Sequence, residues 1–436
     1  MCAMIKNIFI VVVTFILFSC ENGDKTISRS DGAVKTINVD MSSVQYNADV
    51  ISMIDTSWYK IVPLETTEHS LVGGKIKNIY YRNNRLYICE MQTESVLIFD
   101  DSGKFISKIQ ARGEGPGEYL RISSVRINDK GIYIYDDMGL KVLHFDLDGN
   151  YVDRYSLRDC LKKALVPHYV FYVGDRIYVA DQLLTDAKPK YGAPHKVCAI
   201  DMVGDSAVYT KYLPYDLSTA PTYQFYLRDQ KYAINKDGEV HFMCDRTDTI
   251  YVATKDEVRP AYVLDFGKYN LPESMKGEES IRKIRENPDY GKYIWEITHL
   301  MDTDKYLIVK FHYESDEVKK RREDGKSVSD VSFEEQVKNS LSFVHWVVYE
   351  KETGETMLIN DMMLPVFEGY KKFYPRDADG EYLINWVSVF VPMIGKDCKM
   401  MHVSIPDNPR YERELNEVYS SITPNSNPVV FIYKMK

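Results

Sequence analysis

Apolar and polar residues follow one pattern that occurs twice between residues 76 and 154. The segments Ile76–Lys108 and Ile122–Arg154 align without a gap at a spacing of 46 residues and share eight of 33 residues. Each segment contains an alternating run, two short apolar runs and a turn rich in Asp and Gly, which predicts about four short strands. A fixed period of roughly 40–50 residues with about four strands in each unit is typical of β-propeller blades.

The first unit shows why each should fold as a small sheet. Leu86–Cys89 and Val96–Phe99 are nearly continuous apolar runs, as expected for strands buried on both faces. Asp100–Gly103 follows with residues that favour a hairpin turn. A lone four-stranded sheet cannot bury both of its faces, so the units are expected to stack around a common axis.

Weaker copies of the pattern continue to the C-terminus and bring the predicted number of blades to six. Ala33–Val39 and Trp58–Glu65 are predicted strands ahead of the first blade, and we expect them to close the ring by pairing with the last blade. The prediction is an all-β, six-bladed β-propeller with four-stranded antiparallel blades and short surface helices in the C-terminal half. The later blades are predicted around Tyr169–Ala180 with Val197–Asp201, Val240–Cys244 with Thr249–Thr254 and Ala261–Gly267, Tyr306–Phe311 with Phe343–Glu350, and Glu381–Phe390 with Val429–Lys434.

Four stretches between these strands are predicted as insertions. Thr185–Pro194 is rich in Pro and Lys, which predicts a loop. Leu271–Thr298 is expected on the surface, with a short helix around the charged segment Ser280–Arg285. Glu314–Glu335 is highly charged and has no apolar stripe, which predicts a solvated loop. Asp407-Asn408-Pro409 opens a stretch to about Ser421 in which apolar residues recur at helical spacing, so we expect a helix there.

The N-terminus has the features of a bacterial lipoprotein signal. Lys6 precedes the apolar run Ile8–Phe18, which is 11 residues long and too short to cross a bilayer. Polar sequence begins directly after Cys20, which would become the lipidated first residue. The alternative is an ordinary signal peptide cut nearby. The predicted organisation is a signal peptide at 1–19, a polar tether at 20–35 and a single propeller domain at 36–436.

Charge and cysteine content narrow the range of partners. The chain carries a net charge of −9, and it has no basic clusters, which argues against nucleic acid and anionic membrane surfaces as partners. After Cys2 and Cys20, five cysteines remain without a CxxC motif, and no disulfide pairing can be assigned. Cys89, Cys198 and Cys244 lie in apolar runs, where cysteine is expected to behave as a small buried hydrophobic residue.

Several short motifs occur along nearly the whole chain after about residue 58. The most specific is Gly113–Tyr119 (GEGPGEY), and the others are Val62–Thr66 with Val72–Gly73, Asp248–Tyr251 with Tyr262–Gly267, and Asn427–Val430. On these motifs the chain resembles one known family, the six-bladed β-propeller lipoproteins of Bacteroidetes, which are related in style to NHL-repeat propellers. The resemblance implies a cell-envelope location as an outer-membrane lipoprotein, and it implies no particular reaction.

The GEGPGEY segment is also the predicted ligand site. It joins the first blade to the second, and such crossover loops surround one mouth of a propeller's central channel. Arg112, Glu114 and Glu118 could offer charge to a ligand, and Tyr119 could offer a stacking surface. The alternative is structural, because three Gly and one Pro make the backbone turn sharply into the next blade. A glycosidase role for Glu114 and Glu118 would require carboxyl groups about 5–9 Å apart, which loop spacing cannot establish.

No motif for catalysis, a metal or a cofactor is present in the sequence. The nine His show no HxH or HExxH pattern, and there is no nucleophile elbow, P-loop or dinucleotide fingerprint. His144, His241, His312 and His345 alternate with apolar residues and are predicted to be partly buried strand residues. A metal cluster that lines the channel remains an open alternative, because a propeller can bring distant His together.

The sequence favours a binding or scaffold module over an enzyme. The predicted partner is a glycan, a peptide or an envelope protein, with membrane contact only through the lipid at Cys20. The alternative is a propeller lyase or hydrolase that uses carboxylates and His at the channel mouth. A third interpretation, a partner domain in envelope signalling, would require an exposed apolar patch.

Overall fold

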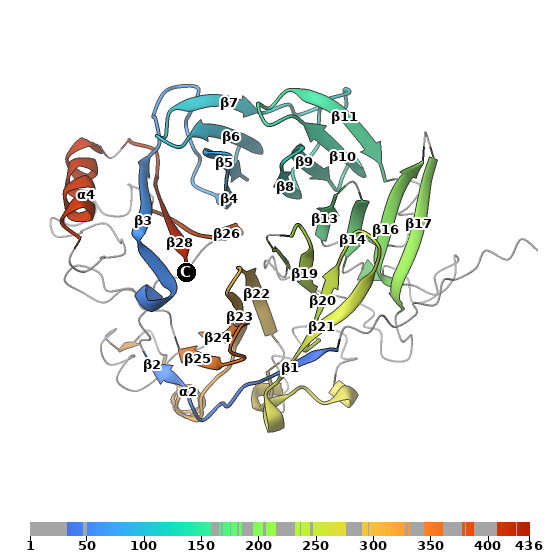
Figure 1. Ribbon diagram of the computed structural model, residues 1–436, viewed down its shortest axis with the longest axis vertical. Coiled ribbons are helices and arrows are strands. Elements are labelled where there is room, and N and C mark those ends of the chain that lie inside the picture. The colour runs from blue at the N-terminus through green and yellow to red at the C-terminus, as the bar shows by residue number, and fades with distance from the viewer. Residues whose placement is uncertain are drawn as a thin grey trace, which may run out of the picture. The chain divides into compact units, whose positions relative to one another are not determined.

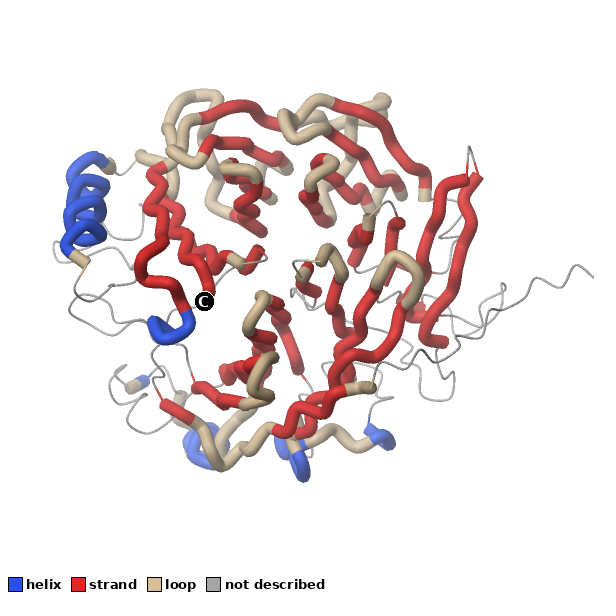
Figure 2. The backbone as a smooth tube through the Cα atoms, in the orientation of Figure 1, coloured by secondary structure: helices blue, strands red, loops and turns tan. Residues whose placement is uncertain are grey.

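Six small antiparallel sheets stand in a ring around one axis in the computed structural model, which confirms the predicted six-bladed β-propeller (Figure 1). The first strand of each blade lies nearest the axis and the last lies at the rim (Figures 1 and 2). This ring lies within the compact unit Asp31–Lys436. The structure describes residues 33–46, 50–157, 165–166, 169–174, 176–180, 183–184, 195–203, 206–214, 232–235, 237–244, 247–275, 290–294, 296–327, 330–331, 344–360, 377–379, 381–387, 408–423 and 425–436.

The first three blades follow one another along the chain, with neighbouring strands antiparallel in sequence order. Two short strands, β12 (Leu165–Val166) and β15 (Leu183–Leu184), form a separate pair. Blade 1 consists of β4 (Ile76–Arg82), β5 (Arg85–Glu90), β6 (Ser95–Asp100) and β7 (Phe105–Ile109). Blade 2 consists of β8 (Ser124–Asn128), β9 (Gly131–Asp136), β10 (Lys141–Phe145) and β11 (Tyr151–Ser156). Blade 3 consists of β13 (Tyr169–Val173), β14 (Arg176–Ala180), β16 (His195–Val203) and β17 (Ser206–Pro214).

The last three blades use strands from both ends of the chain. Blade 4 consists of β18 (Tyr232–Ile234), β19 (Val240–Met243), β20 (Thr249–Ala253) and β21 (Val258–Asp265). Blade 5 consists of β22 (Glu296–Asp302), β23 (Tyr306–His312), β24 (Val344–Glu350) and β25 (Thr356–Asn360). Blade 6 consists of β26 (Asp377–Asp379), β27 (Tyr382–Val387), the C-terminal β28 (Val429–Met435) and the N-terminal β3 (Ile54–Pro63).

Ring closure by an N-terminal strand is confirmed for one of the two predicted segments. β3 pairs antiparallel with β28, so blade 6 contains strands from both ends of the chain. For Ala33–Val39 the predicted partner is wrong. β1 (Lys35–Asn38) runs parallel to β21 at the rim of blade 4, and β2 (Gln45–Tyr46) runs parallel to β25 of blade 5. Ile37 and the nearby Val39 are buried in the core between blades 4 and 5, which fixes the segment there.

Two α-helices and four short 3-10 helices complete the described elements. The solvated loop predicted over Glu314–Glu335 is wrong for its first part, because α2 covers Asp316–Glu323. Its N-cap Ser315 accepts a hydrogen bond from Val318 N, and acidic residues in the first turn and basic residues in the last favour the helix dipole. The predicted C-terminal helix is confirmed as α4 (Pro409–Ser421). The 3-10 helices are η1 (Val50–Met53), η2 (Gly267–Tyr269), η3 (Glu273–Met275) and η4 (Tyr290–Lys292).

Helix α4 lies against β3, the outer strand of blade 6 (Figure 1). Its predicted apolar face is confirmed, since Tyr411 and Leu415 are buried and Val418 and Tyr419 are half-buried against the same cluster. Three other expectations lie outside the described residues: lipidation at Cys20, the loop Thr185–Pro194 and the helix around Ser280–Arg285.

The core lies between neighbouring blades, as the apolar runs predicted. In blade 1, Ile88 and Phe99 pack toward blade 6, whereas Tyr87 and Ile98 pack toward blade 2. All four side chains have 0% exposure. Each central strand therefore buries both faces, one against each neighbouring blade.

An Arg side chain at the start of the second strand connects one blade to the next in two places, between blades 1 and 2 and between blades 3 and 4. Arg85 opens β5 and donates to Asp148 Oδ1 of blade 2 at 2.6 Å. Arg176 opens β14 and donates to the backbone oxygen of Lys255 in blade 4 at 2.9 Å, while Tyr178 Oη donates to the adjacent Thr254 oxygen at 2.7 Å. The sequence pattern Arg-x-Tyr at the start of a second strand therefore forms a latch to the next blade.

We expect Arg176→Ala to lower the free energy of unfolding by about 2 kcal/mol, because it removes charge-assisted hydrogen bonds to Asp201 and Lys255. Urea unfolding measures the change. Lys211→Ala is the matched control, since Lys211 is an exposed cation on the outer strand of the same blade and should cost less than about 0.5 kcal/mol. Equal effects of the two substitutions would contradict the latch.

The alternation of strand direction gives the ring two distinct faces. The turns between first and second strands and between third and fourth strands share one end of every blade, here called the turn face. The turns between second and third strands, and the crossovers from one blade to the next, share the other end, here called the crossover face.

Candidate functional site

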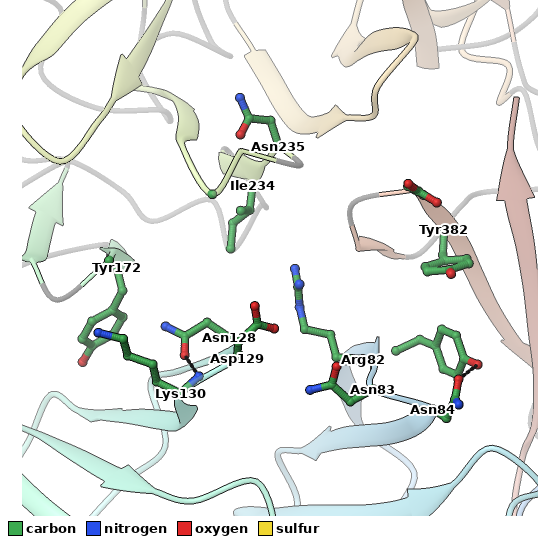
Figure 3. A pocket seen from close by; sticks show the side chains of 14 residues that line it. Arg82, Asn83, Asn84, Asn128, Asp129, Lys130, Tyr172, Ile234, Asn235 and Tyr382 are labelled. Atoms are coloured by element: carbon green, nitrogen blue, oxygen red, sulfur yellow. Dashed lines mark hydrogen bonds between the residues drawn. The ribbon is translucent and has the colours of Figure 1, made fainter.

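A cavity of about 510 Å³ opens at the centre of the turn face (Figure 3). We call it the mouth pocket. Turns between the first and second strands of blades 1, 2, 3, 4 and 6 surround it, and each contributes polar residues. The volume lies in the range of small-molecule sites in proteins.

Asparagines build the rim of the mouth pocket. Asn83 and Asn84 have φ values of +50° and +56°, as the two central residues of a tight hairpin turn require. Asn128 Oδ1 accepts hydrogen bonds from the backbone of its own turn, at 2.9 Å from Lys130 N. Asn235 Oδ1 does the same for the turn of blade 4. Hydrogen bonds within these turns fix their shape, so the rim is preorganised.

Tyrosines form the walls between these turns. Tyr81 and Tyr382 pack edge to face with ring centres 5.1 Å apart, and Tyr81 Oη donates to Asn84 Oδ1 at 3.2 Å. Tyr172 is buried at 8% exposure, with its ring 4.1 Å from that of Tyr133. Burial raises the pKa of Tyr81 and of Tyr172 above the usual value, so both hydroxyls stay protonated at neutral pH.

Of the described residues, four charged ones line the mouth pocket. Arg82 and Lys130 are the cations, and Asp129 and Glu381 are the anions. Glu381 Oε2 lies 3.2 Å from Lys434 Nζ, so its charge is balanced from blade 6 itself. Figure 3 shows the Arg82 guanidinium directed toward the middle of the cavity.

The predicted ligand residues lie on the crossover face, opposite the mouth pocket. Arg112 and Glu114 are exposed there, and Glu118 is half-buried. Tyr119 has 0% exposure, and its hydroxyl donates to the backbone oxygen of Glu94 at 2.6 Å. Burial raises the pKa of Tyr119 to about 12. The ring therefore presents no face to solvent in this structure, and binding by Arg112, Glu114 and Glu118 stays a prediction.

Two glycines of GEGPGEY, Gly113 and Gly115, leave space for the Glu118 side chain, and the third, Gly117, lies against Tyr151. Glu118 Oε2 accepts a hydrogen bond from Gly115 N at 2.8 Å. A Cβ atom added to Gly113 would lie 2.1 Å from the same oxygen, and one added to Gly117 would lie 3.0 Å from the Tyr151 ring. These contacts support the structural interpretation of the motif, a tight backbone turn from blade 1 into blade 2.

Two buried carboxylates on the crossover face, Asp136 and Glu90, were not predicted from the sequence. Asp136 has 0% exposure and accepts from the backbone nitrogens of Leu120 and Gly139, both at 2.9 Å. Glu90 has 1% exposure and accepts from the backbone nitrogens of Gln92 at 2.8 Å and Thr93 at 2.6 Å. The two residues are 46 positions apart, so the repeat itself could have identified them as one recurring structural position.

The four histidines predicted in strands lie in β10, β19, β23 and β24, and the cysteine prediction is confirmed for two of the three described residues. His144 and His312 are half-buried, whereas His241 and His345 are buried in strands. Burial lowers the pKa of His345 to about 4. Cys89 and Cys244 are buried as predicted, whereas Cys198 is half-buried, and none of these three described residues forms a disulfide.

The described residues contain no group of three or more His, Cys, Asp or Glu placed to hold a metal ion. No helix in this part of the chain is long and apolar enough to cross a membrane.

Several solved structures are similar to this chain. A protein of Bacteroides fragilis NCTC 9343, provisionally described as exported, is 15% identical with a TM-score of 0.62, over 92% of this chain and 100% of its own. A DUF4221 family member from Bacteroides vulgatus ATCC 8482 is 14% identical with a TM-score of 0.47, over 88% and 98%. A virginiamycin B lyase of Staphylococcus aureus is 9% identical with a TM-score of 0.39, over 86% and 99%. The likeness to the Bacteroides fragilis protein, at 15% identity, shows the fold alone.

The sequence comparisons give a more specific result. No curated protein matches the sequence. One protein family matches residues 34–434, which include all six blades and the N-terminal strands β1 and β2. Because the match extends over nearly the whole propeller, the chain belongs to the family described as Domain of unknown function (DUF4934).

Proposed function

We propose that this propeller is a ligand-binding module of the cell envelope and that it captures a glycan in the mouth pocket. The observation that carries the proposal is the composition of the pocket. Turns of five blades bring Asn side chains, tyrosine rings and charged groups to one cavity of about 510 Å³. Planar polar side chains beside aromatic rings suit a ligand that has many hydroxyl groups and an apolar ring face.

A glycan fits this lining better than a peptide does. Among the described lining residues Ile234 is the one aliphatic side chain, whereas peptide sites commonly offer apolar pockets for side chains. Tyr382 is half-buried and can contact a sugar ring, and Asn83 is exposed at the rim. A peptide is the second ligand class and enters the test below.

The catalytic alternative, a lyase or hydrolase, has weaker support. Asp129 and Glu381 are carboxylates of the mouth pocket, and Glu381 is paired with Lys434. Among the described residues that line the pocket there is no His. A binding role therefore remains the leading proposal, since it requires only the shape and polarity of the cavity.

A glycan array and a peptide array, probed with the chain from residue 21, test the proposal. That chain retains the whole compact unit Asp31–Lys436. We expect a glycan hit that Asn83→Gly and Lys130→Ala weaken at least about fivefold, and Gly keeps the positive φ that position 83 requires. If only Arg112→Ala weakens the hits, the ligand binds on the crossover face and not in the mouth pocket. Hits on peptides alone would refute the glycan.

The proposed membrane attachment is a lipid on Cys20, as in the outer-membrane lipoproteins of Bacteroidetes that the sequence resembles. We expect Cys20→Ala to shift the chain from the membrane fraction to the soluble fraction, because one lipidated residue provides the anchor. Mass spectrometry of the mature N-terminus measures the acyl groups directly. An unmodified N-terminus at a residue other than Cys20 would contradict lipidation and favour an ordinary signal peptide.

A further inference from the structure

Tyr382 brings an aromatic ring to the wall of the mouth pocket from the interior of a sheet. It is the first residue of β27, and its backbone lies between Asp379 of β26 and Lys434 of β28. The side chain is half-buried, and it lines the cavity. A side chain on a strand paired at both edges has a fixed starting point, so the ring meets the cavity from a rigid element.

Two aromatic neighbours hold the Tyr382 ring in place. The ring centre of Trp58 lies 5.0 Å from that of Tyr382, with 37° between the ring planes. Tyr81 packs on Tyr382 edge to face at 5.1 Å, and Tyr81 Oη itself donates to Asn84 Oδ1 at 3.2 Å. Such ring pairs are favourable beyond the area that they bury. The Tyr382 ring is therefore ordered before a ligand arrives, and binding costs little side-chain entropy.

Polar groups that suit hydroxyl ligands flank this ring. Glu381 also lines the cavity, and Lys434 Nζ lies 3.2 Å from one of its carboxylate oxygens. A carboxylate accepts several hydrogen bonds, so the Glu381 carboxylate can accept from ligand hydroxyls as well. The Asn84 oxygen accepts from Tyr81, so the Asn84 amide nitrogen is the group that can donate to a ligand. Figure 3 shows Asn84 and Tyr382 on the same side of the cavity.

From this geometry we infer that the ligand contains a pyranose ring with an apolar face and that this face stacks on Tyr382. The inference rests on the proposed glycan-binding function and specifies its substrate class. A pyranose chair gathers axial C–H bonds on one face, and these bonds are attracted to the negative face of an aromatic ring. A furanose ring is puckered and offers no comparable face. Glu381 and Asn84 then bind hydroxyl groups at the edge of the stacked sugar.

The first test is calorimetric titration of the chain from residue 21 with three classes of probe. The pyranose probes are xylo-, cello- and galacto-oligosaccharides, and the furanose probes are an inulin-type fructo-oligosaccharide and an arabinofuranose oligosaccharide. All five are uncharged and rich in hydroxyl groups, so they differ mainly in the shape of the sugar face. An aromatic-rich peptide is the third class. We expect one pyranose probe to bind at least about tenfold more tightly than either furanose probe.

Substitutions then test the role of Tyr382. Tyr382→Ala should weaken pyranose binding at least about fivefold, whereas Tyr382→Phe keeps the ring and should change it less than about twofold. Tyr151→Ala is the matched control, because Tyr151 is 39% exposed on the outer strand of blade 2. It should change the affinity less than about twofold.

A fluorescence measurement on the unmodified chain carries the same test if Tyr382→Ala fails to fold. Because the Trp58 ring lies 5.0 Å from Tyr382, a sugar stacked on Tyr382 should change the tryptophan emission. Trp58→Phe should remove most of that change. A pyranose that binds without any change in emission would overturn the role of Tyr382.

The outcomes separate the inference from the proposed function. Tightest binding by a furanose probe would overturn the inference and leave the glycan-binding function standing. Binding of the peptide alone would overturn both. No binding by any of the pyranose probes would overturn the inference, and the glycan array would still decide the function. Pyranose binding that Tyr382→Ala and Tyr151→Ala reduce equally would overturn the role of Tyr382.

Discussion

Asn427→Ala is expected to lower the free energy of unfolding by about 3 kcal/mol, because three buried hydrogen bonds at the closure of the ring are lost together. Asn427 is 3% exposed. Its Nδ2 donates to the backbone oxygens of Glu65 at 2.7 Å and Ser70 at 2.8 Å, and its Oδ1 accepts from Val72 N at 2.9 Å. Alanine would leave these three backbone groups without their partner.

This contact explains two motifs that the sequence analysis treated as separate. Val62–Thr66 with Val72–Gly73 lies in and after β3, and Asn427–Val430 leads into β28, more than 350 residues later in the chain. The Asn427 side chain joins them where blade 6 passes into blade 1. Both motifs therefore belong to one structural feature, the seam that closes the propeller.

Urea unfolding followed by tryptophan fluorescence measures the Asn427 effect, since Trp58 and Trp386 both belong to blade 6. Asn416→Ala is the control, because Asn416 is exposed on α4 and alanine favours a helix there. A loss below about 1 kcal/mol for Asn427→Ala would show that the seam does not depend on this side chain.

The second large effect is expected for Asp302→Ala, again about 3 kcal/mol. Asp302 is 2% exposed at the end of β22 and joins blade 5 to blade 4. Its Oδ2 lies 2.7 Å from His241 Nδ1 of blade 4, and its Oδ1 forms an ion pair with Lys351. Removal of the carboxylate leaves a buried imidazole and a largely buried ammonium group without the anion between them.

A double-mutant cycle identifies this mechanism. Asp302→Ala with Lys351→Met should cost less than the sum of the two single substitutions by at least about 1 kcal/mol, because the second change removes the unmatched charge. Asp304→Asn is the control, since Asp304 is exposed two residues away. Strict additivity would mean that Asp302 acts through packing alone and would refute the charge-based explanation.

Much of the fold could be predicted because a blade is a local structure. The alternation of apolar residues, the buried runs and the Asp-Gly turns of Ile76–Lys108 recur in Ile122–Arg154, and four strands in each blade follow from them. The strand Ala33–Val39 shows the limit of such reasoning. The alternation of apolar and polar residues in this segment predicted a strand. The strand it pairs with, β21, depended on where Ile37 and Val39 could be buried, which is between blades 4 and 5.

The candidate site was harder to predict than the fold, for a physical reason. Local composition singled out Gly113–Tyr119, where glycines and a buried tyrosine form a tight crossover. The turn Arg82–Arg85 was recognisable as a turn, and the sequence indicated nothing of what would lie across the channel from it.

The sequence by itself determined the strands and the blades, because these depend on neighbours within about 50 residues. It also determined the acidic net charge, which depends on composition alone. Only the tertiary structure decided which turns meet. Arg82, Asp129 and Asn235 come together because closure of the ring directs the equivalent turns of separate blades toward one axis. A site made from one turn of each blade has no motif of its own, since its residues share a position in the repeat and not a stretch of the chain.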